Sequence, residues 1–177
     1  MLTIKSNPPS DSTAADIATF QSLILEGGEV DARGLSQRVA HAERLAFALD
    51  DHNLLGIGAL KLPNFRYRKS IFAKSGSSRL PTDFSLELGW VYVKHGFRGR
   101  GISLRLVQEL LATAHGSNVF ATARTNNTAM HRSLERSGFV RDGKPYASEM
   151  RNDKLQLFVR VGTELAAAAS ASQAARR

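Results

Sequence analysis

The chain has 177 residues, which is enough for one domain with a full hydrophobic core. It contains no cysteine, and this excludes disulfides, a thiol nucleophile and thiolate metal ligands. Its net charge of +8 favours an anionic partner, either nucleic acid or a cofactor with several phosphates, although a basic surface kept for solubility has the same composition.

The N-terminal part of the chain predicts a short strand followed by two helices. Thr13 followed by Asp16 is typical of a helix N-terminus, and apolar residues then recur at helical spacing. The pair Gly27-Gly28 ends this helix. The predicted elements are a strand over Leu2–Lys5, a helix over Thr13–Leu25, and a helix over Gly34–Ala42 with Leu35 and Val39 facing inward.

Two apolar segments joined by turn residues predict a β-hairpin over Arg44–Leu49 and Leu54–Leu62. The connection Asp50–Asn53 has the chemistry of a turn. Gly56 and Gly58 in the second strand indicate a bulge, or the close approach of a ligand or of another backbone.

A strongly basic segment follows the hairpin, and we expect Pro63–Thr82 to be irregular. Six basic residues and no acidic residue lie between positions 61 and 79. The basic residues are Lys61, Arg66, Arg68, Lys69, Lys74 and Arg79. The segment is either a loop that faces a substrate or a solvated excursion of the chain.

The second half of the chain alternates strands with helices. Apolar residues occupy every second position of a predicted strand over Phe84–Val93, namely Leu86, Leu88, Trp90 and Tyr92. The remaining predicted elements are a helix over Ile102–Ala114, a strand over Asn118–Ala123, a helix over Asn127–Arg136 closed by Gly138, and two strands, Phe139–Val140 and Lys154–Val161, around a polar hairpin at Gly143–Asp153. This order indicates one mixed α/β sheet with helices on both faces.

We expect a single domain over residues 1–161 and a low-complexity tail over residues 162–177, to which we assign no chemistry. The five histidines show no metal-ligand spacing, so we expect no metal site. No apolar run approaches the roughly 20 residues that span a bilayer, and the N-terminus lacks the apolar segment of a signal peptide. We therefore expect no membrane association and a cytoplasmic location.

The most informative stretch runs from Val91 to Ser103, where a strand ends, glycines turn the backbone and a helix begins at once. The first amides of such a helix lack intrahelical acceptors and carry partial positive charge, so a pyrophosphate is a natural ligand. Gly99 and Gly101 allow phosphate oxygens to approach the backbone, Ser103 offers a hydroxyl, and Arg98 and Arg100 add charge. A plain strand-to-helix connection is the alternative interpretation. The spacing is neither a P-loop nor the dinucleotide fingerprint, because Leu104 stands where the last glycine of that fingerprint would be.

Two motifs carry a family resemblance. Arg98–Ser103 resembles the signature Q/R-x-x-G-x-G/A of the GNAT acetyltransferases, with Ser103 in place of Gly or Ala. Downstream, Asn127 to Phe139 is similar to the family element N-x-x-A-x-x-x-Y-x-x-x-G-F, with Met130 at the alanine position. The resemblance covers roughly Leu2–Val161. It implies a mixed, mostly antiparallel α/β (α+β) sheet with a splayed parallel central pair, flanked by helices.

The resemblance also implies acetyl-CoA as co-substrate, with its pantetheine arm between the strands Phe84–Val93 and Asn118–Ala123. Backbone groups of the first strand would bind the pantetheine amides, and the amides at the start of the helix would hold the pyrophosphate. The residues that the resemblance assigns to acetyl-CoA are Val91, Val93, Arg98, Gly99, Arg100, Gly101, Ile102, Ser103, Leu104 and Asn127.

The implied reaction is direct attack of a neutral amine on the thioester in a ternary complex. An amine with a pKa near 10.4 must first lose a proton, and Glu87 is the candidate base. Mostly apolar neighbours would favour its protonated form if it were buried, whereas a surface glutamate or a structural ion pair is the alternative. Leu134 stands where the family carries the tyrosine that acts as general acid. Ser133 and Tyr146 are weaker candidates for that role. A thiolate leaves readily enough for water to supply the proton.

Two other functions remain open. Loss of the tyrosine permits a non-catalytic module that binds or senses acyl-CoA. The charge permits a nucleic-acid-binding domain, although no recognisable nucleic-acid-binding motif is present. For the enzyme, we expect a small-molecule or peptide amine as acceptor. The basic segment suggests that this acceptor is acidic, and a homodimer is possible because dimers are common in the family.

Overall fold

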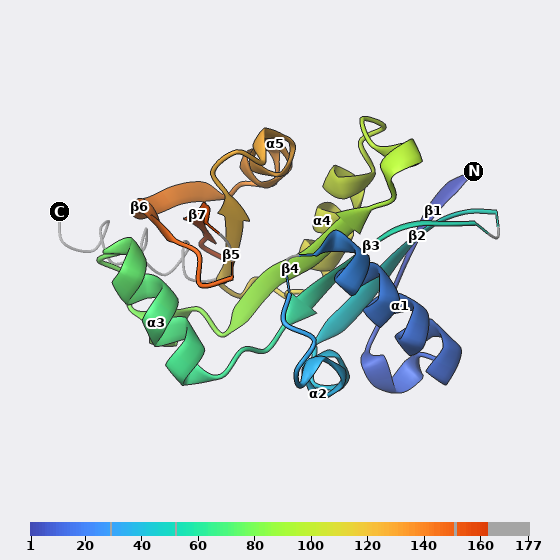
Figure 1. The fold of residues 1–177 in the computed structure, drawn as a ribbon, viewed down its shortest axis with the longest axis horizontal. Coiled ribbons are helices and arrows are strands. Elements are labelled where there is room, and N and C mark those ends of the chain that lie inside the picture. Colours follow the sequence, from blue (N-terminus) through green and yellow to red (C-terminus); the bar gives the residue numbers. More distant parts are fainter. Residues whose placement is uncertain (29, 52, 151, 163–177) are drawn as a thin grey trace, which may run out of the picture.

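The computed structural model describes residues 1–28, 30–51, 53–150 and 152–162, and within them a seven-stranded sheet runs through the centre of the molecule (Figure 1). The strand order is β1-β2-β3-β4-β5-β7-β6, and each neighbouring pair is antiparallel except β4 and β5. The strands are β1 (Leu2–Asn7), β2 (Arg44–Asp50), β3 (Asn53–Lys61), β4 (Leu86–Val93), β5 (Val119–Arg124), β6 (Val140–Ala147) and β7 (Lys154–Arg160). The predicted fold class, a mixed sheet with a parallel central pair, is confirmed.

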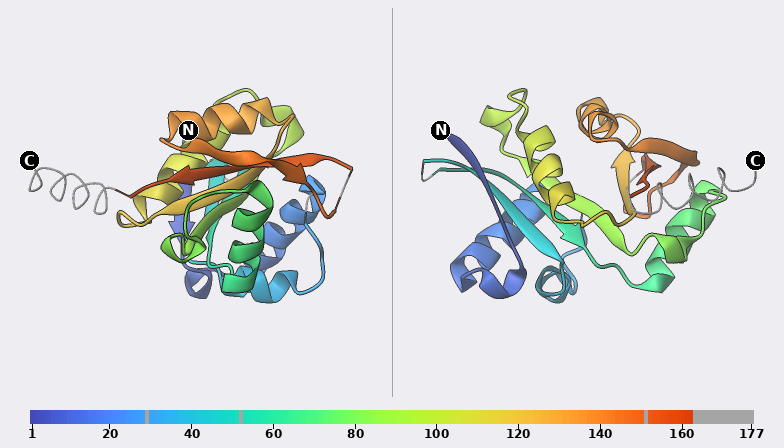
Figure 2. Two further views of the ribbon diagram at one scale, coloured as in Figure 1. Left: turned by 90° about the vertical axis from the view of Figure 1, so that its left-hand side faces the viewer. Right: turned by 180° about the vertical axis from the view of Figure 1, so that it is seen from behind.

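Helices cover both faces of this sheet (Figure 2). Three helices lie on one face, two of them against β2 to β4 and the third against β5 to β7. Two helices lie on the other face and pack over the centre of the sheet. The first set is α1 (Ala14–Gly27), α2 (Leu35–Ala40) and α3 (Phe65–Ser75), and the second is α4 (Ile102–Ala112) and α5 (Thr128–Arg136). Three short 3-10 turns lie at Pro9–Asp11, Pro81–Asp83 and His95–Phe97.

Local sequence signals fix the ends of α1. The Thr13 hydroxyl accepts a hydrogen bond from the amide of Asp16, and the Asp16 carboxylate accepts one from the amide of Thr13, at 3.1 Å each. Gly28 ends the helix in the left-handed region at φ 69°. The predicted N-cap is therefore confirmed, and the helix runs two residues past its predicted end.

The prediction of an irregular Pro63–Thr82 is wrong, because α3 occupies its centre. The side chain of Asn64 accepts a hydrogen bond from the amide of Tyr67 and caps the helix, and Gly76 ends it at φ 65°. Ile71 and Phe72 are buried against the sheet. Two apolar anchors between good caps were enough for a helix despite the many basic residues.

The last two strands also differ from the prediction. The strand predicted at Phe139–Val140 continues as β6 to Ala147, so the polar segment assigned to a hairpin is partly paired with β7. Pairing is irregular between Asp142 and Tyr146, which explains why the sequence shows no clean alternation there. His52 of the predicted turn and residues 163–177 of the predicted tail lie outside the described residues.

A bulge in β4 shapes the centre of the sheet. Trp90 has φ 52°, and the register between β3 and β4 shifts at this point. Leu88 packs on the α4 side, and after the bulge Val91 packs there too, whereas Trp90 and Tyr92 pack on the α1 side. The predicted alternation is thus interrupted, because the inserted residue exchanges the two faces of the strand.

Just before the bulge, β4 leaves β5. The parallel pairing ends at Leu88 and Ala121, although β4 continues to Val93, and the two strands diverge (Figure 1). On the other edge, a Cβ atom at Gly56 would lie 2.7 Å from the carbonyl oxygen of Tyr92, which confirms the close approach expected at this glycine. The sheet is therefore open on one side of β4 and tightly packed on the other.

Candidate functional site

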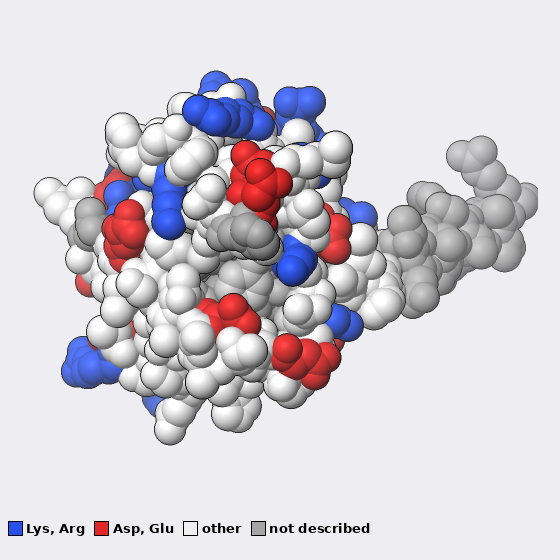
Figure 3. All heavy atoms as spheres, turned by 90° about the vertical axis from the view of Figure 1, so that its right-hand side faces the viewer, with Lys and Arg blue, Asp and Glu red and all other residues white. Residues whose placement is uncertain are grey.

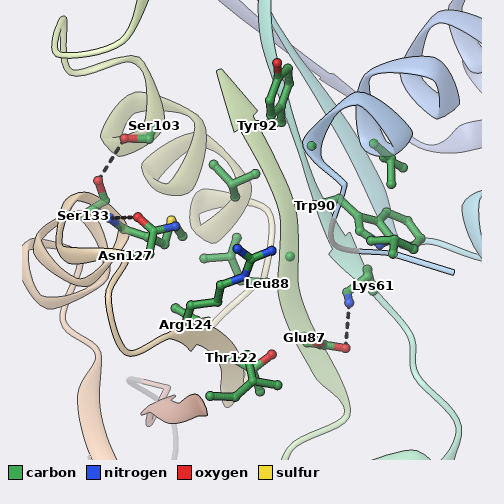
Figure 4. A pocket seen from close by; sticks show the side chains of 18 of the residues that line it. Lys61, Glu87, Leu88, Trp90, Tyr92, Ser103, Thr122, Arg124, Asn127 and Ser133 are labelled. Atoms are coloured by element: carbon green, nitrogen blue, oxygen red, sulfur yellow. Dashed lines mark hydrogen bonds and ion pairs between the residues drawn. The ribbon is translucent and has the colours of Figure 1, made fainter. Parts of the chain in front are cut away.

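A cavity of about 1610 Å³ fills the space where β4 and β5 diverge (Figure 4). Residues from all five helices or their flanking turns contribute to its walls, together with β4, β5 and the hairpin between β6 and β7. Small-molecule pockets commonly measure about 300–1,000 Å³. The volume therefore exceeds that of a typical pocket for one small ligand.

One end of the cavity is the N-terminus of α4. Gly101 is its N-cap with φ 75°, Gly99 has φ 77°, and no side chain caps the first amides. A Cβ atom on either glycine would meet no atom within 4 Å, so the space above this turn is open. The amides that begin α4 are therefore free to bind an anion.

The structure brings together most of the residues that the sequence assigned to this site. Those that line the cavity are Glu87, Val91, Val93, Arg98, Gly99, Gly101, Ile102, Ser103, Leu104 and Asn127. Arg100 does not line it, and its guanidinium lies 5.3 Å from the centre of the Phe97 ring. Arg100 thus sits apart from the other nine residues assigned to acetyl-CoA.

Val93 directs its backbone groups toward the open edge of β4. The amide of the next residue, Lys94, donates to Leu55 on β3, and backbone groups alternate between the two edges of a strand. The carbonyl of Val93 accepts a hydrogen bond from Nε of Arg98 at 3.0 Å. Arg98 therefore ties the open edge of β4 to the glycine turn.

Ser103 and Asn127 have partners within the protein. The two hydroxyl oxygens of Ser103 and Ser133 are 3.0 Å apart and link α4 to α5 (Figure 4). Asn127 is the N-cap of α5, and its side-chain oxygen accepts from the amide of Met130 at 3.1 Å. The side-chain NH₂ group of Asn127 is the part that remains available to a ligand.

Glu87 lies on the opposite side of the sheet from α4 and is only 3% exposed. The expectation of mostly apolar neighbours is wrong, because Nζ of Lys61 lies 2.8 Å from its Oε2 and the hydroxyl of Tyr67 donates to its Oε1 at 3.3 Å. Oε2 lacks a partner with hydrogen-bond geometry, so the lysine contact is an ion pair rather than an aligned hydrogen bond. The alternative of a structural ion pair is therefore realised in this structure.

Lys61 is held over β4 by more than this charge. Its Nζ lies 5.1 Å from the centre of the Trp90 ring, a cation–π distance. A Cβ atom at Gly89 would lie 2.6 Å from Cε and 2.9 Å from Nζ of Lys61. Gly89 therefore makes the room that the ammonium group occupies.

Two tyrosine hydroxyls lie near Glu87. The negative charge of Glu87 is the largest cause that raises the pKa of Tyr67 well above its ordinary value, and burial is the second. The residue as a whole is 39% exposed, so its ring is only partly shielded from solvent. Burial, followed by the charges of Glu87 and Glu149, raises the pKa of Tyr146. The Tyr146 hydroxyl is buried without a hydrogen-bond partner. Leu134, at the position of the family tyrosine, is fully buried and does not line the cavity.

The face of α3 that lines the cavity carries only one of the basic residues of this helix, Lys74. Tyr67, Ser70, Ile71 and Lys74 line the cavity, as expected for one face of a helix, whereas Arg66, Arg68 and Lys69 do not. The partners of the basic residues are Glu87 for Lys61, Glu149 for Lys74, Asp142 for Arg79, and the carbonyls of Pro81 and Phe84 for Arg68.

Sequence reasoning assigned no site role to Trp90 or Arg124, and it considered Lys61 and Tyr67 only as part of the basic segment that could face a substrate. Arg124 ends β5 and points into the cavity, with Nε 3.6 Å from Oδ2 of Asp153 (Figure 4). The contact of Lys61 with Glu87 depends on the register of β3 and β4, which cannot be read from the sequence. A glycine inside a predicted strand was the available signal, because Gly89 marks a close approach.

Within the part of the chain that the structure describes, no three His, Asp or Glu side chains are grouped as a metal site would require. No helix among the same residues has the length and apolarity to cross a membrane.

Comparisons with known proteins give a family and a fold. The model of the acetyltransferase (GNAT) family matches residues 16–139 of the chain. No curated protein matches it.

Three solved structures illustrate the similarity of fold. An acyl-CoA N-acyltransferase from Pseudomonas aeruginosa has a TM-score of 0.63 at 18% identity, covering 91% of this chain and 100% of that chain. Arabidopsis thaliana NAA60 in complex with a bisubstrate analogue has a TM-score of 0.65 at 17% identity, covering 90% and 98%. A GNAT family acetyltransferase from Elizabethkingia anophelis with acetyl-CoA bound has a TM-score of 0.59 at 13% identity, covering 90% and 97%.

Proposed function

The chain belongs to the acetyltransferase (GNAT) family, and from this premise we propose that it transfers an acetyl group from acetyl-CoA to an amine. The observation that carries the proposal is the open N-terminus of α4 beside the splayed strands β4 and β5. These two features provide an anion site and an unpaired strand edge in one cavity. A cofactor that ends in phosphates and continues as an amide-bearing arm fits both.

The residues present fit CoA in chemical type. Amides of the turn from Gly99 to Leu104 would bind the pyrophosphate, and the open edge of β4 at Val91 and Val93 would pair with the pantetheine amides. Arg98 would add charge to the phosphate end of the cavity. The NH₂ group of Asn127 would donate to the arm from the other wall.

The amine would bind on the side of Glu87. Leu86 and Leu88 pack toward α4, so Glu87 between them points to the opposite face of the sheet. The carboxylate would take the proton that the amine loses before attack, directly or through water. A cavity of about 1610 Å³ is large enough for both substrates, which supports direct transfer in a ternary complex.

Proton supply to the leaving thiolate would not follow the family route. Leu134 is fully buried and has no proton to donate. A free thiol has a pKa of about 8.5, so the thiolate is a tolerable leaving group at neutral pH and can take its proton from water. The loss of the tyrosine therefore lowers the rate of transfer without removing the route.

The same leucine supports a second candidate, a module that binds acyl-CoA without turning it over. Both candidates need the phosphate site, and only the enzyme needs Glu87. Release of free thiol in the presence of an amine distinguishes them. A binding module would hold acetyl-CoA and release no thiol with any amine tested.

The first experiment is calorimetric titration with acetyl-CoA, CoA and dephospho-CoA. Micromolar affinity for acetyl-CoA and CoA is the expected result, and an acceptor screen by thiol release then follows. Absence of binding would contradict the proposal and leave nucleic acid as the anionic partner to test. Basic and acidic residues are interspersed on the face shown in Figure 3, so this face offers no continuous basic stripe to nucleic acid.

A further inference from the structure

Lys61 carries a primary amine into the part of the cavity where the acceptor amine is proposed to bind. It is paired with Glu87 in the register of β3 and β4, so both side chains leave the sheet on the same face. The Lys61 side chain is 17% exposed and lines the cavity. The chain thus supplies its own amine to the carboxylate proposed as base.

Three features together form a cradle for an ammonium group. The Glu87 carboxylate lies 2.8 Å from Nζ, the Trp90 ring lies 5.1 Å away, and the missing side chain of Gly89 leaves space for the group. The carboxylate and the ring both stabilise a buried positive charge, and the space at Gly89 gives that charge room. Lys61 itself occupies this cradle, so an external amine would take the same place only after the Lys61 ammonium has left it.

The cradle lies where the proposed arm of CoA would end. The β4–β5 pairing stops at Leu88, and Nζ of Lys61 lies over the next residue, Gly89. The open strand edge that would hold the pantetheine begins beyond this point. An acyl group held at the inner end of this open edge would therefore lie near Gly89, beside Lys61.

We propose that Lys61 is an internal acceptor, which the enzyme acetylates from its own bound acetyl-CoA. The proposal rests on the proposed function. The ammonium of Lys61 would give a proton to Glu87, and Nζ would then attack the thioester carbonyl carbon. An amide C–N bond forms, the C–S bond breaks, and the thiolate of CoA leaves and takes up a proton.

A fixed position beside the thioester offsets the small fraction of lysine that is neutral and able to attack. An ordinary primary amine with a pKa near 10.4 is neutral in only about one molecule in 250 at pH 8. Effective molarities reach about 10⁵–10⁸ M when two reactants are held in a well-oriented geometry. An amine fixed beside the thioester therefore outcompetes the exposed lysines, although these are better solvated and freer to move.

Acetylation of Lys61 changes the charge of the acceptor subsite. The acetylated side chain is neutral and no longer pairs with Glu87, whose carboxylate then faces the cavity without its cation. An unpaired buried carboxylate attracts a new cation strongly. The modified enzyme would therefore bind the ammonium form of an external amine better than the unmodified enzyme.

The test compares acetyl-CoA with acetyl phosphate, a free acetylating reagent that needs no binding site. Purified full-length protein is incubated with each at about pH 8, and the rate at each lysine is followed by intact mass and peptide mapping. Lys69 is the internal control, because it is exposed on α3 and does not line the cavity. The Gly101→Glu variant, with its phosphate site blocked, is the control for templating by bound cofactor.

Acetyl-CoA is expected to modify Lys61 before Lys69, at a rate independent of protein concentration, and acetyl phosphate is expected to reverse this order. Gly101→Glu should lose the preference for Lys61. Bound acetyl-CoA that leaves Lys61 unmodified, or equal labelling of Lys61 in Gly101→Glu, overturns internal acetylation alone. Failure of the wild type to bind acetyl-CoA by calorimetry overturns the proposed function as well, so the two failures are distinct.

Discussion

The glycine turn before α4 can be tested with two substitutions that separate backbone strain from charge. Gly101 has φ 75°, and an added Cβ would meet no atom within 4 Å. The only cost of Gly101→Ala is then the left-handed conformation, about 1–2 kcal/mol. For a domain of this size the melting temperature should fall by about 2–4 °C per kcal/mol, and acetyl-CoA should still bind.

Gly101→Glu adds a carboxylate at the same place. A unit charge about 5 Å from one phosphate charge, at an effective dielectric constant of 20, costs about 3 kcal/mol. That energy corresponds to an increase of roughly 150-fold in the Kd for acetyl-CoA. Calorimetry at low ionic strength measures the difference, and added salt should reduce it.

Gly76 provides the matched control. It follows α3 with φ 65°, an added Cβ would also meet no atom within 4 Å, and the residue does not line the cavity. Gly76→Glu should therefore lower the melting temperature as much as Gly101→Glu and leave acetyl-CoA affinity unchanged. Wild-type affinity in Gly101→Glu, or an equal loss in both variants, would refute the assignment of the turn as the phosphate site.

Three further predictions concern the other end of the cavity. Tyr146→Phe removes a buried hydroxyl without a partner, so the melting temperature should rise by about 2–4 °C; a fall would show that the hydroxyl is bonded. Lys61→Met leaves Glu87 buried and unpaired and should cost about 3 kcal/mol in urea denaturation, whereas an unchanged midpoint would mean that the ion pair contributes nothing. Glu87→Gln should slow thiol release at neutral pH and lose less at high pH, where the amine sheds its proton unaided, and an unchanged pH–rate profile would remove Glu87 from the mechanism.

The glycine turn before α4 was predictable because it is local in sequence. The strand, the two glycines and the start of the helix lie within Val91–Ser103, and the chemistry belongs to backbone amides rather than to distant side chains. The cap formed by Thr13 and Asp16 was predictable for the same reason. A feature that one continuous segment completes needs no knowledge of the register or of the packing.

α3 shows how composition can hide a helix. Its caps, Asn64 and Gly76, were visible in the sequence, but only Ile71 and Phe72 anchor it among many basic residues. The charge pattern favoured a loop, whereas the caps and two buried side chains decided the structure. The capping residues therefore predict this helix better than the net charge of the segment does.

The bulge at Trp90 shows the opposite limit. Uninterrupted alternation from Leu86 to Tyr92 predicts one regular strand, and nothing in that pattern signals an inserted residue. In the structure, Trp90 and Tyr92 both pack on the α1 side. The exchange of faces then depends on tertiary packing, which no local propensity encodes.

The acceptor side was the least predictable part, because its charges come from separate segments and neutralise one another. Lys61 pairs with Glu87, and Lys74 pairs with Glu149 on the hairpin between β6 and β7. The basic residues without a place in the cavity wall, such as Arg66, cannot select the charge of an acceptor there. A count of charges along the chain therefore suggested an acidic acceptor, whereas in the structure these charges are paired and Lys61 fills the ammonium cradle at Glu87. Under the proposed function, a negative group on the acceptor would therefore find Lys61 and Lys74 already paired with carboxylates.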